Sequence, residues 1–329
     1  MQKEASFYSK LEENKVKCEL CPVGCVISPG NKGVCLGRKN TEGKLIAVNY
    51  GQAVSTAMDP IEKKPLYHFY PGSKIFSTGP NGCNLGCKNC QNWAISQEEV
   101  HTDFFSPEDM VNIALKNCSI GIAYTYTEPL IWYEYVLDTA ELVREAGMVN
   151  VLVTNGYVNP QPLEALLPVV DAMNIDLKSM DEGFYKDVCK GKVSPVLNTI
   201  ETVFRAGCHL EITNLVIPGL NDSEEQIRRL VDWVAKLSDR IPLHFSRYFP
   251  DYKMNAPPTP ITALTKAYEM GREKLKYVYV GNAYIHGASD TYCPACANML
   301  IRRERYLTQI LGVENRKCKM CGSPVDIII

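Results

Sequence analysis

Seven short apolar segments alternate with stretches of helical periodicity through the middle of this 329-residue chain. In order along the chain they are Lys74–Gly79, Ser119–Tyr126, Asn150–Gly156, Val169–Lys178, Cys208–Gly219, Ile241–Pro250 and Tyr277–Asn282. Strand–helix alternation of this kind predicts a parallel sheet, with helices at 130–147, 223–237 and 261–275. Six or seven such units favour an α/β fold built as a full or partial parallel (β/α) barrel over a doubly wound sheet.

Polar or turn residues follow the predicted strands, as in the sequences TYTEP, TNGY and DLKS. In parallel barrels, catalytic side chains gather at the carboxyl ends of the strands. Any one of these segments, taken alone, is explained as an ordinary strand exit. Because five exits carry polar groups beside a cysteine-rich loop on a sixth, we expect a functional site at this end of the barrel.

Eleven of the fourteen cysteines fall into three groups. The groups are Cys18, Cys21, Cys25 and Cys35; Cys83, Cys87 and Cys90; and Cys293, Cys296, Cys318 and Cys321. In a reducing compartment, clusters of this kind indicate metal ligands rather than disulfides. The three isolated cysteines, Cys118, Cys189 and Cys208, are expected to be core thiols, because free cysteine packs as a small hydrophobe.

The last group consists of two Cys-x2-Cys pairs separated by a segment that we expect to form a hairpin, a spacing typical of a zinc ribbon. Zinc is the first expectation there and a rubredoxin-like iron the second. The first group has a less diagnostic spacing, which fits either zinc or a second iron–sulfur cluster, and zinc is again the first expectation because nothing in the sequence identifies a redox role. A disulfide pair is the weaker alternative for that group.

The middle group offers three thiolates in one short loop, whereas a closed structural site normally takes four ligands. Either a ligand comes from elsewhere in the chain, such as a histidine completing a zinc site, or one metal position is left open. Cys83-x3-Cys87-x2-Cys90 after the first barrel strand resembles the signature of the radical S-adenosylmethionine (SAM) enzymes. Residues 91–96 resemble the branch related to glycyl-radical-enzyme activases. Residues 59–73 resemble the AmmeMemoRadiSam-system proteins, described earlier as pyruvate formate-lyase activase-like.

This resemblance covers nearly the whole chain and implies a cofactor. Three thiolates would hold three irons of a [4Fe–4S] cluster, and the fourth iron would bind the amino and carboxylate groups of SAM. One electron from the cluster would then cleave SAM to methionine and a 5′-deoxyadenosyl radical that abstracts hydrogen. The cofactor carries this chemistry, and the protein supplies position and a dry site.

The resemblance also implies which residues contact SAM. By position, the candidates are Thr127, Glu128, Thr154, Asn155, Gly156, Asp176, Lys178 and His244. Residues 217–222 resemble the segment that lies along the adenine. Val153 lacks the carboxylate with which some relatives bind a monovalent cation, so we expect no such cation here. His244 fits a satisfied core histidine as well as a ligand contact.

The expected organisation is an N-terminal cysteine-rich region over 1–58, a radical SAM barrel over 59–285 and a zinc-ribbon-like unit over 286–329. The leading hypothesis is an enzyme that abstracts hydrogen from a protein or peptide. The alternatives are modification of RNA or of a small molecule, and a non-catalytic iron–sulfur electron carrier. The RNA hypothesis depends on basic residues around the ribbon, although a solvated charged face is the preferred explanation for them: Arg302, Arg303, Arg305, Arg316, Lys317 and Lys319.

The charge balance argues against a polyanionic partner. Thirty-five basic residues face thirty-seven acidic ones, which gives a net charge of −2 and no strong field toward nucleic acid or a membrane surface. No apolar run approaches the roughly 20 residues that span a bilayer, and the polar N-terminal segment does not resemble a signal peptide. We therefore expect a cytoplasmic protein. The resemblance implies a low-potential electron donor such as a flavodoxin or ferredoxin, and its family name points to partners of the Memo and AMMECR types.

Overall fold

The computed structural model describes residues 3–329, and its centre is a nine-stranded sheet. The strand order is β15-β14-β13-β12-β11-β10-β8-β7-β9. The strands are β7 (Gln52–Pro60), β8 (Lys74–Pro80), β9 (Asp103–Phe104), β10 (Gly121–Tyr124), β11 (Val149–Thr154), β12 (Ala172–Asp176), β13 (His209–Val216), β14 (Leu243–Arg247) and β15 (Val278–Gly281). All seven predicted strands are present and run parallel, whereas β7 and β9 are antiparallel. Because β15 and β9 remain as edges, the sheet is a partial barrel, which confirms the predicted fold class.

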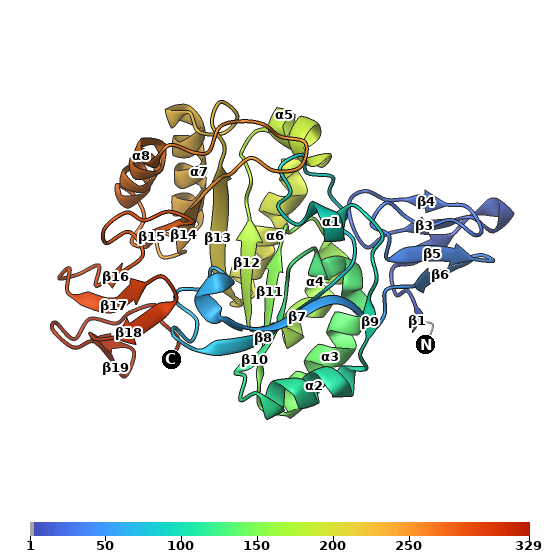
Figure 1. Cartoon of the computed structure of the whole chain (residues 1–329), viewed down its shortest axis with the longest axis horizontal. Helices are drawn as coiled ribbons and strands as arrows, with labels where there is room; N and C mark the ends of the chain where they lie inside the picture. The colour runs from blue at the N-terminus through green and yellow to red at the C-terminus, as the bar shows by residue number, and fades with distance from the viewer. Residues whose placement is uncertain (1–2) are drawn as a thin grey trace.

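Helices follow most of the parallel strands and cover the outside of the sheet (Figure 1). They are α1 (Trp93–Ser96), α2 (Pro107–Lys116), α3 (Tyr133–Glu145), α4 (Pro160–Leu166), α5 (Glu182–Phe184), α6 (Val193–Arg205), α7 (Glu224–Leu237) and α8 (Ile261–Arg272). Local chemistry sets several of these boundaries. Ser106 and Asp109 form a reciprocal capping box at the start of α2, and the Ser223 hydroxyl caps α7. The predicted helices α3, α7 and α8 are confirmed within a few residues.

The connection between β7 and β8 packs into the open barrel. The ring of Tyr67 lies 4.8 Å from that of His244, and the ring of His68 lies 4.3 Å from that of Tyr277. Glu211, which is fully buried on β13, accepts hydrogen bonds from the His68 amide at 2.7 Å and from His244 Nε2 at 2.6 Å. Burial alone would raise the pKa of Glu211, but the hydrogen bonds from His209 and His244 outweigh it and lower the pKa. This carboxylate therefore ties the connection to the interior of the barrel.

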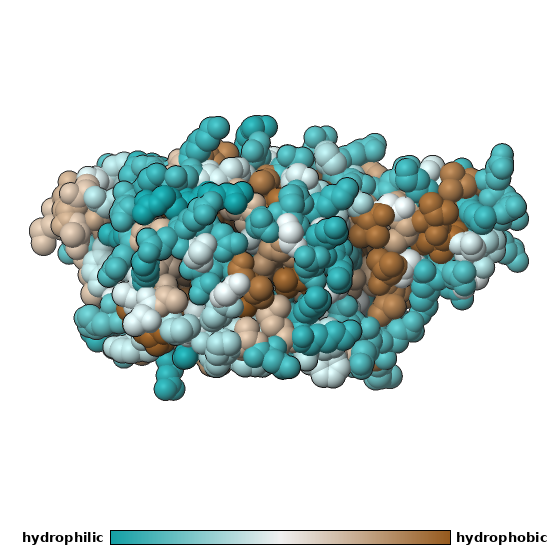
Figure 2. Space-filling model, turned by 90° about the horizontal axis from the view of Figure 1, so that it is seen from above, coloured by the Kyte–Doolittle hydropathy of each residue, from teal (hydrophilic) through white to brown (hydrophobic). Residues whose placement is uncertain are grey.

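The N-terminal region forms two small sheets on one side of the barrel (Figure 1). Their strands are β1 (Lys3–Glu4), β2 (Tyr8–Lys10), β3 (Val16–Cys18), β4 (Val26–Ile27), β5 (Arg38–Thr41) and β6 (Lys44–Ala47). Arg38 pairs with Glu134 of α3 at 2.5 Å, and the Tyr50 hydroxyl donates to Asp138 of the same helix. At this end of the molecule, apolar side chains gather on the surface (Figure 2). The exposed apolar side chains of this region include Val26 and Val34.

The C-terminal region forms a second small unit on the opposite side (Figure 1). Its strands are β16 (Thr291–Tyr292), β17 (Met299–Glu304), β18 (Leu307–Ile310), β19 (Val313–Glu314) and β20 (Lys317–Cys318). The antiparallel β17–β18 pair confirms the hairpin expected between the two cysteine pairs. Arg303 is buried, donates to the Tyr67 carbonyl at 2.6 Å and lies over the Tyr67 ring at 4.3 Å. The unit is thus fastened to the same connection that fills the barrel.

Short 3₁₀ and π turns complete the secondary structure: η1 (Glu12–Asn14), η2 (Ile61–Lys63), η3 (Pro129–Trp132), η4 (Leu167–Val169) and the π turn η5 (Tyr185–Cys189). Over residues 3–329, none of the helices combines the length and apolarity that a bilayer crossing requires.

Replacing Glu211 by glutamine should lower the free energy of unfolding by about 3 kcal/mol, because the change breaks a buried ionic network and leaves histidine donors unpaired. Denaturant titration followed by circular dichroism would measure the loss. The exposed Glu164→Gln change in α4 is the matched control and should alter stability by less than about 0.5 kcal/mol. Equal stability of the two variants would contradict the role given to Glu211.

Candidate active site

The three-cysteine loop begins two residues after β8, and its first turn requires glycine. Gly82 has a φ of +105°, and a Cβ at this position would lie 2.2 Å from the carbonyl oxygen of Cys35. Any side chain would therefore meet the N-terminal region and adopt an unfavourable backbone conformation. The close approach therefore fixes the position of Cys83, the residue that follows Gly82.

The turn η5 holds the other side of this loop. The amide of Gly86 donates to the Cys189 carbonyl and the amide of Lys88 to the Val188 carbonyl, both at 2.9 Å. Ser96 Oγ lies 3.2 Å from the sulfur of Cys90. The loop is thus held by two backbone hydrogen bonds from η5, which is distant in the sequence, and by a local side-chain contact.

The three cysteines open onto a cavity of about 580 Å³ at the carboxyl ends of the strands. Six of the eight predicted SAM-contact residues line it: Thr127, Glu128, Thr154, Asn155, Asp176 and Lys178. The cavity lies within the range of about 300–1,000 Å³ that is typical of ligand sites. The structure therefore brings most of the predicted contacts together around the cysteine loop.

Glu128 is 1% exposed and is the most tightly held carboxylate of the cavity. Its Oε1 accepts hydrogen bonds from Thr154 Oγ1 at 2.6 Å and from the Leu130 amide at 3.0 Å, and its Oε2 accepts from the Asn155 amide at 2.8 Å. Burial raises the pKa of Glu128 to about 7, although these hydrogen bonds act in the opposite direction. Oε2 keeps acceptor capacity for a further donor.

Asp176 and Lys178 form an ion pair at the carboxyl end of β12, the strand next to β11. Their side chains meet at 2.8 Å and are 38% and 19% exposed. Each can therefore bind the other or a ligand in the cavity. The Lys178 amide also donates to the Tyr185 hydroxyl of η5, so the turn that holds the cysteine loop also orients this residue.

Asn155 connects the third strand to the cysteine loop. Its Nδ2 lies 2.9 Å from Asn84 Oδ1 and 3.6 Å from the sulfur of Cys83. The sequence interpretation missed Asn84 and Ser96, and it missed Ser246 and Asn282 in the cavity wall. Asn84 lies between two of the cysteines and Ser246 lies near the carboxyl end of β14, but neither residue type identifies a cofactor contact without the fold.

The other two predicted contacts lie outside the cavity lining. Gly156 is at the exit of β11, where its amide bonds to Thr154. His244 lies two residues before Ser246 on β14, so it points to the same face one layer deeper in the barrel. There it is 3% exposed and bonded to Glu211. His244 is therefore a satisfied core histidine rather than a residue facing the cavity.

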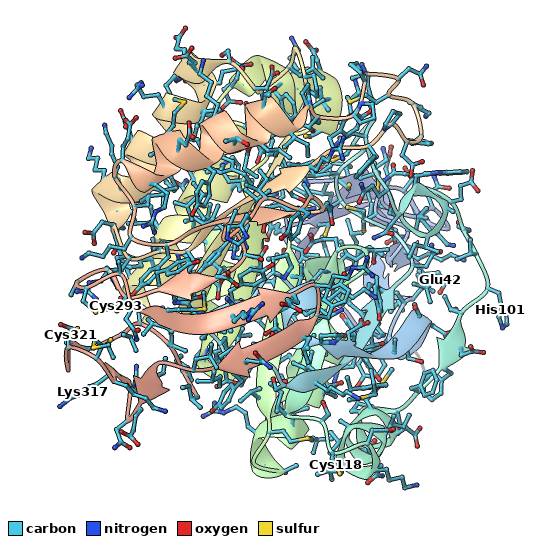
Figure 3. The ribbon with its side chains drawn as sticks, turned by 60° about the vertical axis from the view of Figure 1, so that its left-hand side comes forward. Glu42, His101, Cys118, Cys293, Lys317 and Cys321 are labelled. Carbon is cyan, nitrogen blue, oxygen red and sulfur yellow. The ribbon has the colours of Figure 1, made fainter. Side chains whose placement is uncertain are left out.

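The isolated cysteines differ from one another. Cys189 is buried in η5 as expected, and Cys208 is half-buried. The expectation of a core thiol is wrong for Cys118, which is exposed on the turn before β10 and lies far from the C-terminal cysteines (Figure 3). With a φ of +51°, Cys118 ends a helix rather than packing inside the core.

The four C-terminal cysteines converge on one point. Sulfur–sulfur distances are 3.7 Å for Cys293 with Cys321 and for Cys296 with Cys318, and all four sulfurs lie within 4.8 Å of one another. Figure 3 shows Cys293 and Cys321 on neighbouring segments of this unit. The arrangement matches a tetrahedral four-thiolate site for a single ion.

Comparison with known proteins identifies the barrel. Residues 78–231 match the family model of the Radical SAM superfamily. An uncharacterized protein of Methanocaldococcus jannaschii is 46% identical over 99% of this chain and 100% of its own length. The chain belongs to the radical SAM superfamily. The domain and the activating enzymes among its relatives make it an enzyme.

More distant radical SAM proteins cover parts of the chain. The pyruvate formate-lyase-activating enzyme of Clostridium pasteurianum is 26% identical, over 47% of this chain and 67% of its own length. The solved structure of a radical SAM methyltransferase from Sphaerobacter thermophilus has a TM-score of 0.52 at 13% identity, covering 91% of this chain and 81% of that one. This structural likeness shows a shared fold.

Membership of the radical SAM superfamily implies a [4Fe–4S] cluster and SAM, and the residues present fit both. Cys83, Cys87 and Cys90 supply three soft thiolate ligands at the edge of the cavity, and the wall next to them carries acceptors for an amino group and a cation for a carboxylate. The sulfurs of these three cysteines do not all lie within 4.8 Å of one another, unlike those of the C-terminal group among the described residues 3–329.

Replacing Gly82 by alanine should prevent the cysteine loop from closing on the N-terminal region, because the new Cβ overlaps the Cys35 carbonyl. We expect the reconstituted variant to bind less than about a tenth of the wild-type iron at this loop, read as the amplitude of its electron paramagnetic resonance (EPR) signal.

Gly147→Ala is the matched control, because Gly147 also has a positive φ, of +72°, but has no atom within 4 Å of the added Cβ. This control should bind iron normally and lose only about 1 kcal/mol of stability. Normal iron content in the Gly82 variant would contradict the steric argument.

Proposed function

We propose that this protein is a radical SAM enzyme that abstracts a hydrogen atom from a protein or peptide substrate. The observation that carries the proposal is the convergence of Cys83, Cys87 and Cys90 with Glu128 and the Asp176–Lys178 pair on one cavity. When bound, the reduced [4Fe–4S] cluster supplies the electron that cleaves SAM to methionine and a 5′-deoxyadenosyl radical. The chain itself binds, orients and shields these groups.

The polar residues of the cavity divide the recognition of SAM between two walls. Glu128 accepts a hydrogen bond from the amino group, and Thr154 and the Asn155 amide hold its carboxylate in place. At the end of β12, Lys178 binds an oxygen of the SAM carboxylate or ribose, and Asp176 accepts from a ribose hydroxyl or orients the lysine. Charge-assisted bonds of this kind stabilise a bound ligand by about 1.5–3 kcal/mol each.

Two considerations support a protein or peptide substrate. The pyruvate formate-lyase-activating enzyme of Clostridium pasteurianum carries a protein target in its name, and its similarity to this chain covers 47% of it. The cavity also extends past the predicted SAM contacts to Lys63, Lys64 and Tyr126. This part of the cavity can contact a substrate group while SAM is bound. A low-potential flavodoxin or ferredoxin fits as the electron source, and Memo-type and AMMECR-type proteins stay as candidate partners.

The observations that favoured RNA are weaker in the folded protein. Arg303 is buried against Tyr67, and the Arg302 guanidinium pairs with Glu304 at 2.5 Å. The basic stretch around the ribbon is therefore partly internal and partly neutralised, which leaves a smaller surface for phosphates.

We also propose that the C-terminal cysteines bind zinc. Four thiolates at 2.3 Å from one Zn²⁺ in a tetrahedron stand about 3.8 Å apart. The sulfur–sulfur distances of 3.7 Å support this assignment. The ion would stabilise a unit that contains only short strands.

The raised pKa of Glu128 predicts a pH dependence of SAM binding. Because the carboxylate is protonated below about pH 7, its hydrogen bond from the SAM amino group is present above that pH and is lost as the pH falls through it. Isothermal titration at pH 6 and pH 8 should show a steeper loss of affinity in the wild type than in the Glu128→Gln variant. Because the SAM amino group titrates in both proteins, the difference isolates the carboxylate. Identical slopes would show that Glu128 does not contact SAM.

The substrate class can be tested by SAM turnover. The reduced enzyme should form 5′-deoxyadenosine faster, by at least about tenfold, when the protein fraction of a cell extract is added. Protease treatment of that fraction should remove the stimulation, and nuclease treatment should leave it unchanged. The Cys87→Ala variant is the control for background cleavage. Stimulation that survives protease and disappears with nuclease would favour RNA, and stimulation by the small-molecule filtrate alone would also contradict the proposal.

A further inference from the structure

The four N-terminal cysteines surround a small cavity that the proposed reaction does not use. Cys18, Cys21, Cys25 and Cys35 line it together, in a volume of about 10 Å³, which is roughly one water-sized sphere. The remaining wall is largely apolar and includes Leu20, Ile27 and Ile131. Four thiols, one at the end of β3 and three from the segments that follow it, thus line one cavity in a setting of low polarity.

The spacing of these thiols differs from that of the zinc-like C-terminal site. Within residues 3–329, the C-terminal sulfurs gather inside 4.8 Å, whereas neither the N-terminal group nor the group of Cys83, Cys87 and Cys90 contracts to that extent. Four thiolates around one Zn²⁺ at about 2.3 Å leave no room for a water-sized sphere between them. The water-sized space beside the N-terminal thiols therefore favours an iron–sulfur cluster, in which each thiolate binds its own iron, over a single zinc ion.

Arg38 provides an independent observation. Its side chain lines the same cavity and is 2% exposed. One nitrogen, Nη1, pairs with Glu134, but Nε and Nη2 are buried without a hydrogen-bond partner. Two unpaired donors of a buried guanidinium are costly unless an acceptor fills the cavity. The sulfides and thiolates of an anionic cluster are such acceptors, and hydrogen bonds to them tune its potential.

The N-terminal site touches the cysteine loop of the active site. The Cys35 carbonyl lies against Gly82, the residue before Cys83. On the other side, the Asn84 side chain lies within hydrogen-bonding reach of the Cys21 thiol, and Asn84 is bonded to Asn155 beside the Cys83 sulfur. Gly82 therefore lies between Cys35 of the N-terminal site and Cys83 of the active site. The Asn84 side chain lies between Cys21 and the same loop.

We propose that Cys18, Cys21, Cys25 and Cys35 hold an iron–sulfur cluster that passes electrons to the cluster at Cys83, Cys87 and Cys90. A low-potential one-electron protein donor, such as reduced flavodoxin or ferredoxin, is oxidised by one electron. The N-terminal cluster is reduced and then reoxidised as the electron moves on, so one electron enters and one leaves for each SAM cleaved. Cys21 and Cys25 are only half-buried, which gives a donor access to the cluster. The assignment of an iron–sulfur cluster to these four cysteines does not depend on the proposed function of the barrel site, whereas the relay role rests on it.

Metal analysis of anaerobically reconstituted protein tests the identity of the site. If both cysteine groups hold [4Fe–4S] clusters, we expect about eight irons and one zinc per chain. The Cys21→Ala/Cys25→Ala variant should lose about half of the iron and keep the zinc, and the exposed Cys118→Ala variant should lose neither. About four irons with two zinc ions in the wild type would overturn the proposal. A Cys83→Ala/Cys87→Ala/Cys90→Ala variant separates the sites: retention of all its iron would refute the barrel site and leave the N-terminal one standing.

Reduction kinetics test the relay. In the Cys21→Ala/Cys25→Ala variant, photoreduced flavodoxin should reduce the barrel cluster at least about tenfold more slowly than in the wild type, as followed by freeze-quench EPR. Full reduction by dithionite and unchanged SAM affinity would show that the variant is folded and that its barrel site is intact. The milder Cys25→Ser variant keeps three thiolates and should alter only the EPR signal of the N-terminal cluster. Equal rates of reduction by flavodoxin in the wild type and the double variant would overturn the relay.

Discussion

The close approach of Gly82 to the Cys35 carbonyl joins the three parts on which the candidate site depends. Through this contact, the end of β8 and the cysteine loop lie against the N-terminal region. Gly82 has a positive φ there, which only glycine adopts easily. From the other side, η5 holds the same loop through two backbone hydrogen bonds and orients Lys178 through the Tyr185 hydroxyl. The cysteines therefore do not lie on a free loop, and their positions follow from packing around them. Pre-organisation of this kind is what a cluster with one open iron requires.

Charge in the barrel is arranged in two layers with different roles. The deeper layer is closed, because Glu211 satisfies His68, His209 and His244 and fixes the β7–β8 connection inside the sheet. The upper layer is incomplete, because Glu128 keeps acceptor capacity and the Asp176–Lys178 pair is partly exposed to the cavity. Buried polar groups that are fully paired stabilise a fold, whereas those with spare capacity at a cavity bind ligands. In the barrel, groups of the second kind lie where the strands end.

Much of this arrangement could be predicted from the sequence, because it depends on local patterns. Apolar segments with polar exits identified all seven parallel strands, and the carboxyl-end rule brought Glu128, Asp176 and Lys178 to one site. The sequence left His244 open between a core histidine and a ligand contact, because side chains on a strand alternate with a period of two, so His244 and Ser246 share a face, and one sequence does not tell which layer each occupies. The contact of Cys35 with Gly82 and the unpaired nitrogens of Arg38 could not be predicted, since both arise from segments brought together only by the fold. For the same reason, spacing alone left zinc and iron–sulfur chemistry open at the N-terminal cysteines.

The central claim is that three thiolates leave one iron free to bind SAM in this cavity. Electron–nuclear double resonance on the reduced protein with SAM labelled by ¹⁵N at its amino group tests this claim directly. The account predicts a resolved ¹⁵N coupling to the cluster in the wild type and in the N-terminal Cys21→Ala/Cys25→Ala variant, because the open iron belongs to the group of Cys83, Cys87 and Cys90. A reduced cluster that shows no coupling to the labelled nitrogen at saturating SAM would contradict it.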